Sequence, residues 1–439
     1  MLKSLPQTAT APFCPSEVQG SINVPQGLSF WKKLFLFAGP GLLVSVGYMD
    51  PGNWATDIEA GSRFGYSLLF IVLLSSLAAI VLQCLSLRVG LVSGRDLAQL
   101  CRDQYSKPVR LTLWVLAEIA IIACDIAEVL GSALAFKLLF GCSMIVGICI
   151  TALDTVVILS LKGRGFRQVE AIILGLVLTI AACFVVELIL VAPHWPDVFT
   201  GFIPRVQTFA QTEPWYLAIG ILGATVMPHN LYLHSSIVQT RSNGRSEKQI
   251  KESLMLAQVD TIGSLGLAFF VNAAILILAA SAFYSTGHTA VTEIDDAYHL
   301  LDPIVGSGIA SLLFGIALLA SGQSSTFTGT IAGQILLEGF LNLKIPCWKR
   351  RVITRGMALI PALLGIWWFG ENSVGRLLVL SQVVLSFQLP FAIYPLIRFA
   401  SDRKLMGSFK IGSSVKIVSW MLFVVITGAN IWLILQLMR

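Results

Sequence analysis

The chain has 439 residues, of which 56% are hydrophobic and only 12% are charged. Soluble proteins carry about twice that charged fraction, so the composition excludes an ordinary soluble enzyme or binding domain and predicts a membrane protein. The net charge of +6 does not indicate a nucleic-acid-binding protein. The basic residues are in short loops between apolar segments, where they set the orientation in a membrane.

Apolar segments of about 20 residues recur along the chain, and each is long enough to cross a bilayer as a helix. We therefore expect an all-α polytopic membrane protein with eleven transmembrane helices. Residues 1–33 are polar, contain several prolines and lack the apolar region of a signal peptide, which predicts a mobile cytoplasmic tail. The predicted spans are 34–62, 67–93, 110–136, 141–161, 169–192, 214–240, 258–284, 307–336, 351–369, 375–398 and 414–437.

Most Lys and Arg residues fall in alternate loops, on the side that also holds the N-terminus. The positive-inside rule makes that side cytoplasmic and, with eleven spans, puts the C-terminus outside. The outer loop at 285–306 carries four acidic residues and no Lys or Arg. It is either an acidic mouth that concentrates cations or an ordinary solvated loop. The eight cysteines show no CxxC spacing, and most are expected to act as small hydrophobic residues.

Two predicted spans are interrupted near their middle by a proline that follows a metal-capable side chain. Asp-Pro-Gly-Asn at 50–53 interrupts the first span, and Met-Pro-His-Asn at 227–230 interrupts the sixth. Proline removes a backbone donor and disfavours the helical conformation of the preceding residue, so carbonyls near Gly47 and Ala224 lose their partners. Inside a bilayer, such groups are tolerated only where they line a cavity enclosed by protein.

The two interruptions occupy corresponding positions in two halves of five spans each. Interrupted spans in this relation indicate a transporter built from inverted repeats, with its binding site near the bilayer midplane. We expect residues 34–192 to form the first repeat and residues 193–399 the second. Residues 400–439 would then form an additional eleventh span.

Asp50 is the strongest single indication of function, because a carboxylate at mid-bilayer costs about 2.5–3.5 kcal/mol on insertion scales. A structural role as the cap of the broken helix is the alternative, and the two roles are compatible. Asn53 and Met227 would complete a mixed oxygen and sulfur site. A thioether favours transition metals, whereas oxygen ligands alone suit Mg²⁺ and Ca²⁺. Gln382 in the tenth span could add an oxygen ligand, although a hydrogen bond between helices explains it nearly as well.

The third span carries three acids, Glu118, Asp125 and Glu128, whose offsets of 7 and 3 place them on one helix face. Intramembrane acids mark ion paths or proton relays. His229 and His234 in the sixth span can titrate near neutral pH. The alternative is a static polar network that pairs these acids with basic residues such as Arg350 and Arg351.

At these residues the chain resembles the Nramp family of proton-coupled divalent metal transporters, and especially its bacterial manganese-transporting members. The similarity rests on residues 50–53, 125–128, 223–229 and 232–235, and it extends over nearly the whole chain from about residue 30. Asn230 is a small departure, because many bacterial members have an aliphatic residue there.

The resemblance implies a LeuT-like fold in the bacterial cytoplasmic membrane and symport of protons with Mn²⁺ or Fe²⁺, with Cd²⁺ also carried. It implies that Asp50, Asn53, Met227 and the Ala224 carbonyl hold the metal, and that the Gly47 carbonyl and Gln382 do so in some states. It also implies a proton pathway through His229, Asp125 and Glu128, with Arg350 and Arg351 beyond it. The metal is substrate, so no cofactor is expected, and no obligate protein partner is evident.

Two other classes of function compete with this interpretation. A sodium-coupled amino-acid transporter can have the same fold, but the carboxylate of its substrate would meet Asp50. An intramembrane metalloenzyme is disfavoured, because the sequence has no HExxH motif and no Cys or His cluster with zinc spacing. We therefore expect a transporter, not an enzyme.

Overall fold

The computed structural model describes residues 19–25, 27–160, 166–205, 212–242, 244–289, 291–343 and 347–437. These residues are almost entirely helical. Their one strand pairing joins β1 (Ile22–Asn23) to β2 (Arg241–Ser242) in parallel. Residues 19–33, which fall in the predicted mobile tail, thus contain a paired strand and the start of a helix, α1 (Phe30–Phe37).

Both predicted interruptions are present, and each span is formed by two separate helices. The first half of the chain contains α2 (Pro40–Gly47), α3 (Pro51–Phe64), α4 (Leu69–Ser93), α5 (Leu97–Gln104), α6 (Lys107–Phe140), α7 (Met144–Ser160), α8 (Phe166–Val191) and α9 (Trp195–Thr200). The second half contains α10 (Thr212–Val226), α11 (Pro228–Ile237), α12 (Glu247–Ala279), α13 (Ile294–Val305), α14 (Ala310–Leu341), α15 (Cys347–Phe369), α16 (Val374–Ser401), α17 (Arg403–Met406) and α18 (Ser413–Leu437). Short 3₁₀ turns at 65–68, 238–240, 371–373 and 407–409, and a π-helical turn at 280–284, extend or join these helices.

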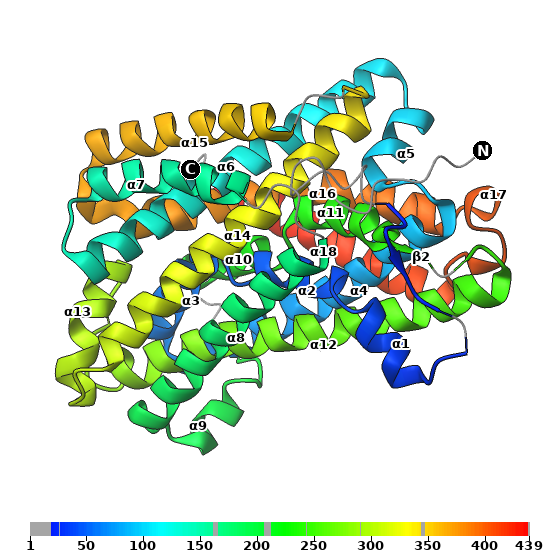
Figure 1. The fold of residues 1–439 in the computed structure, drawn as a ribbon. Coiled ribbons are helices and arrows are strands. Elements are labelled where there is room, and N and C mark those ends of the chain that lie inside the picture. Colours follow the sequence, from blue (N-terminus) through cyan, green and yellow to red (C-terminus); the bar gives the residue numbers. More distant parts are fainter. Residues whose placement is uncertain are drawn as a thin grey trace.

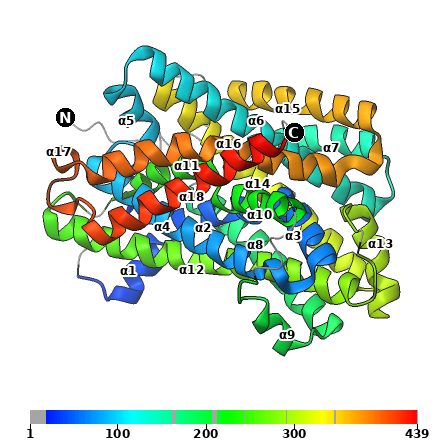
Figure 2. The same cartoon turned by 180° about the vertical axis from the view of Figure 1, so that it is seen from behind.

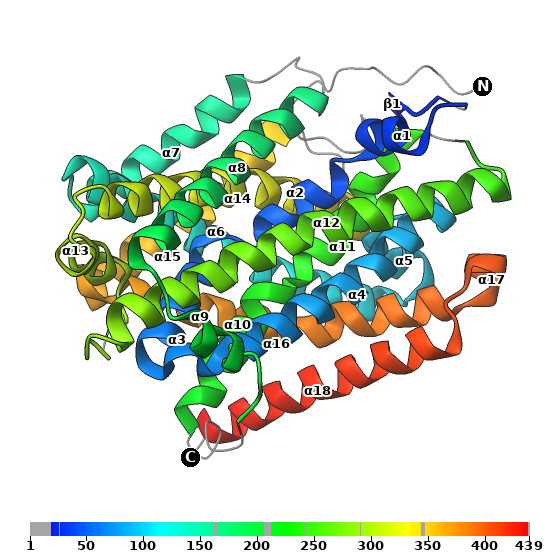
Figure 3. The same ribbon diagram turned by 90° about the horizontal axis from the view of Figure 1, so that it is seen from below.

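The four half-helices lie in the middle of the molecule, and long helices surround them (Figures 1 and 3). Helix α12 packs against the first broken pair, α2 and α3, and helix α4 packs against the second pair, α10 and α11. Helices α16, α6 and α14 each contact both α3 and α11. Helix α18 lies on the outside against α16, as the view from behind shows (Figure 2). A polar site at the breaks is therefore enclosed by protein, as a bilayer requires.

Six helical segments in the described residues are long and apolar enough to cross a membrane by length and composition. Helix α6 and the start of α7 form a further candidate, bent by 115° at a short break, and α15 contributes a shorter apolar segment, Arg355–Phe369. Half-helices such as α2 and α11 are too short to satisfy this criterion alone. The protein is thus an all-helical membrane protein with multiple apolar spans.

The two ends of the bundle differ in charge. Helices α1, α5 and α17 lie at one end, and α9 and α13 lie at the other (Figures 1 and 2). The first group carries Lys and Arg, whereas α13 begins with Asp295 and Asp296. The charge difference has the sense that the sequence predicts for a cytoplasmic and an outer side.

Helix α2 is fastened at the basic end of the bundle. Asp260 on α12 accepts hydrogen bonds from the backbone of Gly41, at 2.7 Å, and of Gly39. The buried guanidinium of Arg241 donates to the carbonyl of Ala38 at 2.8 Å and pairs with Glu170 on α8 at 2.7 Å. These contacts hold the start of the first half-helix against α8 and α12.

Candidate functional site

Asp50 ends the first interruption as the N-cap of α3. Its backbone is extended, with φ −67° and ψ 163°, and Pro51 occupies the first helical position. The Asp50 Oδ1 atom accepts a hydrogen bond from the Asn53 backbone at 2.9 Å. An Asp at the N-cap satisfies a donor that the helix leaves unpaired. The capping role considered from the sequence is therefore present, and it uses only one of the two carboxylate oxygens.

Met227 forms the second interruption between α10 and α11. Its φ of 32° lies in the left-handed region, which few residues other than glycine adopt. Pro228 then begins α11, and Asn230 Nδ2 contacts the Met227 sulfur at 3.7 Å. Met227 is fully buried, so its thioether is turned toward the protein interior.

The carboxamide of Asn53 joins the two interruptions. Its Nδ2 atom donates to Asp50 Oδ1 at 2.6 Å and to the Ala224 carbonyl at 3.2 Å. Two of the oxygens predicted as metal ligands therefore converge on one point, although they are 174 residues apart in sequence. At that point an amide NH₂ now makes the contacts that a small cation would make.

The remaining predicted ligands lie against the same half-helices. A side chain at Gly47 would collide with the carboxamide of Asn230, and a side chain at Gly52 would collide with the carboxamide of Gln382. These two glycines leave the space in which the neighbouring helices approach α2 and α3. The structure therefore brings Gln382 to the first turn of α3, beside Asp50.

Other helices satisfy the carbonyls that the first interruption releases. Asn272 on α12 donates to the Tyr48 carbonyl at 2.8 Å, and Ser321 on α14 donates to the Met49 carbonyl at 2.5 Å. The sequence analysis missed both residues. A single Asn or Ser in an apolar helix is a weak signal, because only contacts with other helices reveal its role.

Several oxygens at the interruptions have no hydrogen-bond partner within the described part of the chain. They are Asp50 Oδ2, Thr225 Oγ1, Gln382 Oε1 and Asn230 Oδ1, all buried. Unsatisfied buried oxygens are costly, and a cation would satisfy them. Among the described residues, no cluster of three or more His, Cys, Asp or Glu could hold a metal. A site here would therefore depend on one carboxylate with amide, carbonyl and thioether groups.

Two acids predicted for the proton pathway lie together near the second interruption. Gly329 on α14 faces both Asp125 Oδ1 and Glu128 Oε1, and a side chain there would collide with Glu128. Cys124 links this pair to α11, because its sulfur is 3.6 Å from Glu128 Oε1 and 3.8 Å from His229 Nε2. Sequence reasoning treated this cysteine as a hydrophobic residue, and only the packing of α6 against α11 reveals its position.

Two other predicted pathway residues lie apart from this group. Glu118 accepts a hydrogen bond from Trp114 in its own helix at 3.0 Å. The ring of His234 binds Gln83 Oε1 at 2.9 Å, and Gln83 donates to the Tyr48 hydroxyl at 2.7 Å. His234 therefore faces α4 and α12, whereas His229 faces α6.

Arg350 and Arg351 lie in α15, but their side chains are outside the described part of the structure. Among the described side chains of that helix, Arg355 is buried and donates to the Thr151 carbonyl at 3.1 Å. Arg355 is close enough to Glu128 to act on it electrostatically. Arg355 lies one turn after Arg350 and Arg351, the pair predicted from the sequence. Nothing in the sequence of this helix indicated that Arg355 was the better candidate.

The acidic segment 285–306, which the sequence predicts to lie outside, contains α13. Lys137 from α6 reaches into it and pairs with Asp295 at 3.4 Å and with Glu371 at 3.6 Å. Glu293 Oε2 accepts a hydrogen bond from the Gly375 backbone at 2.6 Å, and burial raises the pKa of Glu293 to about 7. Part of the acidic charge is thus neutralised by a lysine from another helix.

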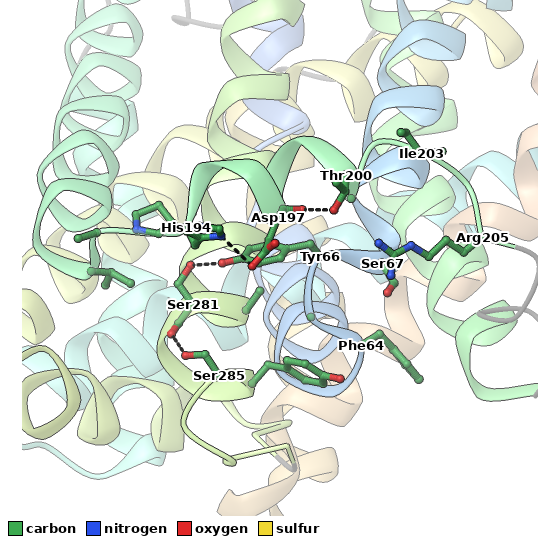
Figure 4. A pocket seen from close by; sticks show the side chains of 17 residues that line it. Phe64, Tyr66, Ser67, His194, Asp197, Thr200, Ile203, Arg205, Ser281 and Ser285 are labelled. Atoms are coloured by element: carbon green, nitrogen blue, oxygen red, sulfur yellow. Dashed lines mark hydrogen bonds and ion pairs between the residues drawn. The ribbon is translucent and has the colours of Figure 1, made fainter.

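A separate cavity of about 580 Å³ lies near α9, the end of α3 and the π-helical turn after α12 (Figure 4). Its lining includes a hydrogen bond between Tyr66 and Ser281 at 2.8 Å and a contact between His194 Nδ1 and Asp197 Oδ2 at 3.0 Å. None of the predicted metal or proton residues lines it. The cavity is therefore not the site at the broken helices.

Comparisons with known proteins agree with this architecture. The chain is 62% identical over 437 residues to the divalent metal cation transporter MntH of Ralstonia nicotianae, covering 100% of this chain and 99% of that protein. It is 62% identical to MntH 1 of Pseudomonas aeruginosa, with 99% of each chain covered. A crystal structure of a manganese transporter mutant from Eremococcus coleocola matches with a TM-score of 0.88 at 38% identity, covering 94% of this chain and 89% of that one.

More distant structures share the fold alone. Mhp1 matches with a TM-score of 0.58 at 14% identity, covering 99% of this chain and 93% of that one, which agrees with the predicted LeuT-like fold. The family profile described as Natural resistance-associated macrophage protein-like matches residues 41–436. With that match over most of its length, the chain belongs to the Nramp family.

Proposed function

We propose that this protein is a proton-coupled symporter that imports divalent transition metal ions by alternating access. Its substrates are Mn²⁺ and Fe²⁺, and it also carries Cd²⁺. The manganese and divalent metal transporters to which it is similar support this assignment. The observation that carries the proposal is the convergence of Asp50 Oδ1 and the Ala224 carbonyl on one buried donor.

The metal is held between the two broken helices. Asp50 supplies the negative charge, Asn53 and the Ala224 carbonyl supply neutral oxygens, and Met227 supplies sulfur. The Gly47 carbonyl and Gln382 join the ligand set in some conformations. Sulfur with oxygen suits a transition metal better than Ca²⁺ or Mg²⁺, and a single carboxylate leaves a divalent ion bound weakly enough to be released.

Protons use His229, Asp125 and Glu128, which lie beside the metal site but contribute no ligand to it. Cys124 contacts both His229 and Glu128, so the group is continuous from α11 to α6. Arg355 lies beyond Glu128 and holds positive charge at the far end of this path. Glu118, His234, Arg350 and Arg351 were also predicted for the pathway and remain candidates for its outer parts.

Alternating access moves the half-helices relative to the long helices around them. The protein has eleven spans, with repeats at 34–192 and 193–399 and the eleventh span after them. The N-terminus is cytoplasmic and the C-terminus is outside the cytoplasmic membrane. In this orientation the bonds from Gly41 to Asp260 and from Arg241 to the Ala38 carbonyl lie on the cytoplasmic side. We expect them to break before the metal is released inside.

The test is Mn²⁺ uptake by purified protein in liposomes, with internal pH followed in parallel. We expect Mn²⁺ to enter and the lumen to acidify, both more strongly when the outside is acidic. An amino-acid transporter on the same fold would instead accumulate an amino acid with Na⁺ and leave Mn²⁺ outside. Failure to transport any divalent metal in active, correctly folded protein would overturn the proposal.

A further inference from the structure

We infer that Asn272 on α12 is a positioning residue for metal binding, because it determines which end of the Asn53 carboxamide faces the site. This inference rests on the proposed function, in which Asn53 is a ligand of the transported metal. Asn272 is fully buried and lies outside both broken helices. It is not among the ligands proposed above.

The hydrogen bonds of Asn272 connect the first interruption to Asn53. Its Nδ2 atom donates to the Tyr48 carbonyl at 2.8 Å and to Asn53 Oδ1 at 3.4 Å. Its own Oδ1 atom has no partner within the described residues. The carboxamide of Asn272 thus contacts Asn53 through its nitrogen and has one buried oxygen that no described residue uses.

The orientation of the Asn53 carboxamide determines which of its two polar atoms faces the site. Its oxygen faces Asn272, and its nitrogen faces Asp50 and Ala224, where the cation would bind. A metal ion repels the N–H groups and attracts the oxygen, so metal binding requires the carboxamide to turn over. After that turn, the Asn53 nitrogen faces α12 and needs an acceptor there.

Asn272 supplies that acceptor without losing its other bond. Its unpartnered Oδ1 accepts from Asn53 Nδ2, while its Nδ2 continues to donate to the Tyr48 carbonyl. Each amide therefore remains hydrogen-bonded in both orientations of Asn53. Without Asn272, the turned carboxamide would leave a buried N–H group unsatisfied, which opposes metal binding.

The experiment measures Mn²⁺ binding to the purified full-length protein by titration calorimetry. Asn272→Ala is expected to weaken binding about threefold to tenfold, the usual range for one net hydrogen bond. Asn430→Ala is the matched control, because Asn430 is also a buried amide but binds Ser386 between α16 and α18. That control should leave Mn²⁺ affinity unchanged.

A second background separates positioning from a general structural role. Asn53→Asp replaces the carboxamide by a carboxylate, whose two oxygens are alike and need no orienting. In this background, Asn272→Ala should change Mn²⁺ affinity by less than about twofold, because only the oriented amide requires Asn272. A structural role would produce the same loss in both backgrounds.

The outcomes distinguish the inference from the proposed function. If the wild-type protein does not bind Mn²⁺, the proposed function fails. If it binds Mn²⁺ and Asn272→Ala has either no effect or the same effect in both backgrounds, the role of Asn272 is wrong. Should Asn272→Ala fail to fold, Asn272→Leu keeps a similar side-chain volume without the amide, and we expect it to weaken Mn²⁺ binding by about threefold to tenfold. Unchanged affinity in that variant would also contradict the inference.

Discussion

Asp50 has two roles at the first interruption, and substitutions can separate them. One carboxylate oxygen caps α3 through the Asn53 backbone, while the other has no partner in the described structure. Asn caps helices about as well as Asp, whereas Ala does not. Asp50→Asn should therefore keep the cap and lose the charge, and Asp50→Ala should lose both.

The two effects differ in size. Loss of the cap costs about 1 kcal/mol of stability, so Asp50→Ala is expected to unfold at lower temperature and Asp50→Asn near the wild-type temperature. Removing one partner of a buried charge pair costs about 3–5 kcal/mol. At 1.4 kcal/mol per factor of ten, both variants should bind Mn²⁺ about 10²-fold to 10⁴-fold more weakly.

The assay compares thermal unfolding in detergent with Mn²⁺ uptake into liposomes for wild type, Asp50→Asn and Asp50→Ala. We expect the two variants to differ in stability but to share the loss of uptake. If Asp50→Asn transports Mn²⁺ at the wild-type rate, the carboxylate is only a cap and the metal site lies elsewhere.

Three further predictions concern protons, selectivity and pH. Asp125→Asn and His229→Ala should each reduce proton entry more than Mn²⁺ binding, measured by internal pH and by calorimetry, and unchanged pH-driven uptake in both would place the relay elsewhere. Met227→Ala should still carry Mn²⁺ and should admit Ca²⁺. It should bind Cd²⁺ about tenfold more weakly, since sulfur is the ligand that Cd²⁺ prefers. If excess Ca²⁺ fails to compete with Mn²⁺ uptake in this variant, sulfur does not set selectivity. The folded-state pKa of Glu293, about 7, exceeds its ordinary value of 4.5, so its contribution to stability is present at low pH and is lost as pH rises through about 7. Glu293→Gln should make thermal stability less dependent on pH between 5 and 8, and an unaltered profile would contradict that assignment.

The interruptions could be predicted because their signal is local. A proline beside Asp50 or Met227 in an apolar segment breaks a helix wherever that helix packs, and the chemistry of the flanking side chains is readable directly. The capping role of Asp50 could be anticipated for the same reason, because a cap depends only on residues next to the break. The position of Asp125 and Glu128 on one helix face could likewise be predicted, because it depends only on their spacing within one segment.

The residues that the sequence analysis missed depend on contacts between segments. Asn272, Ser321 and Cys124 gain their importance from helices that lie far away in sequence, and each alone resembles an ordinary core residue. The pairing of β1 with β2 joins residues more than 200 positions apart and has no local pattern. Arg355 gains its role from a contact with another helix, because it donates to the Thr151 carbonyl of α7.

The backbone of Met227 places stability and metal selectivity in opposition. A non-glycine residue held in the left-handed region costs about 1–3 kcal/mol, and glycine adopts that conformation freely. Met227→Gly should therefore relax the chain between α10 and α11 while it removes the only sulfur proposed as a ligand. Selection for thermal stability alone would favour that glycine. The strained methionine is therefore explained by its proposed role as a metal ligand and not by folding. An effort to stabilise this transporter should leave position 227 untouched.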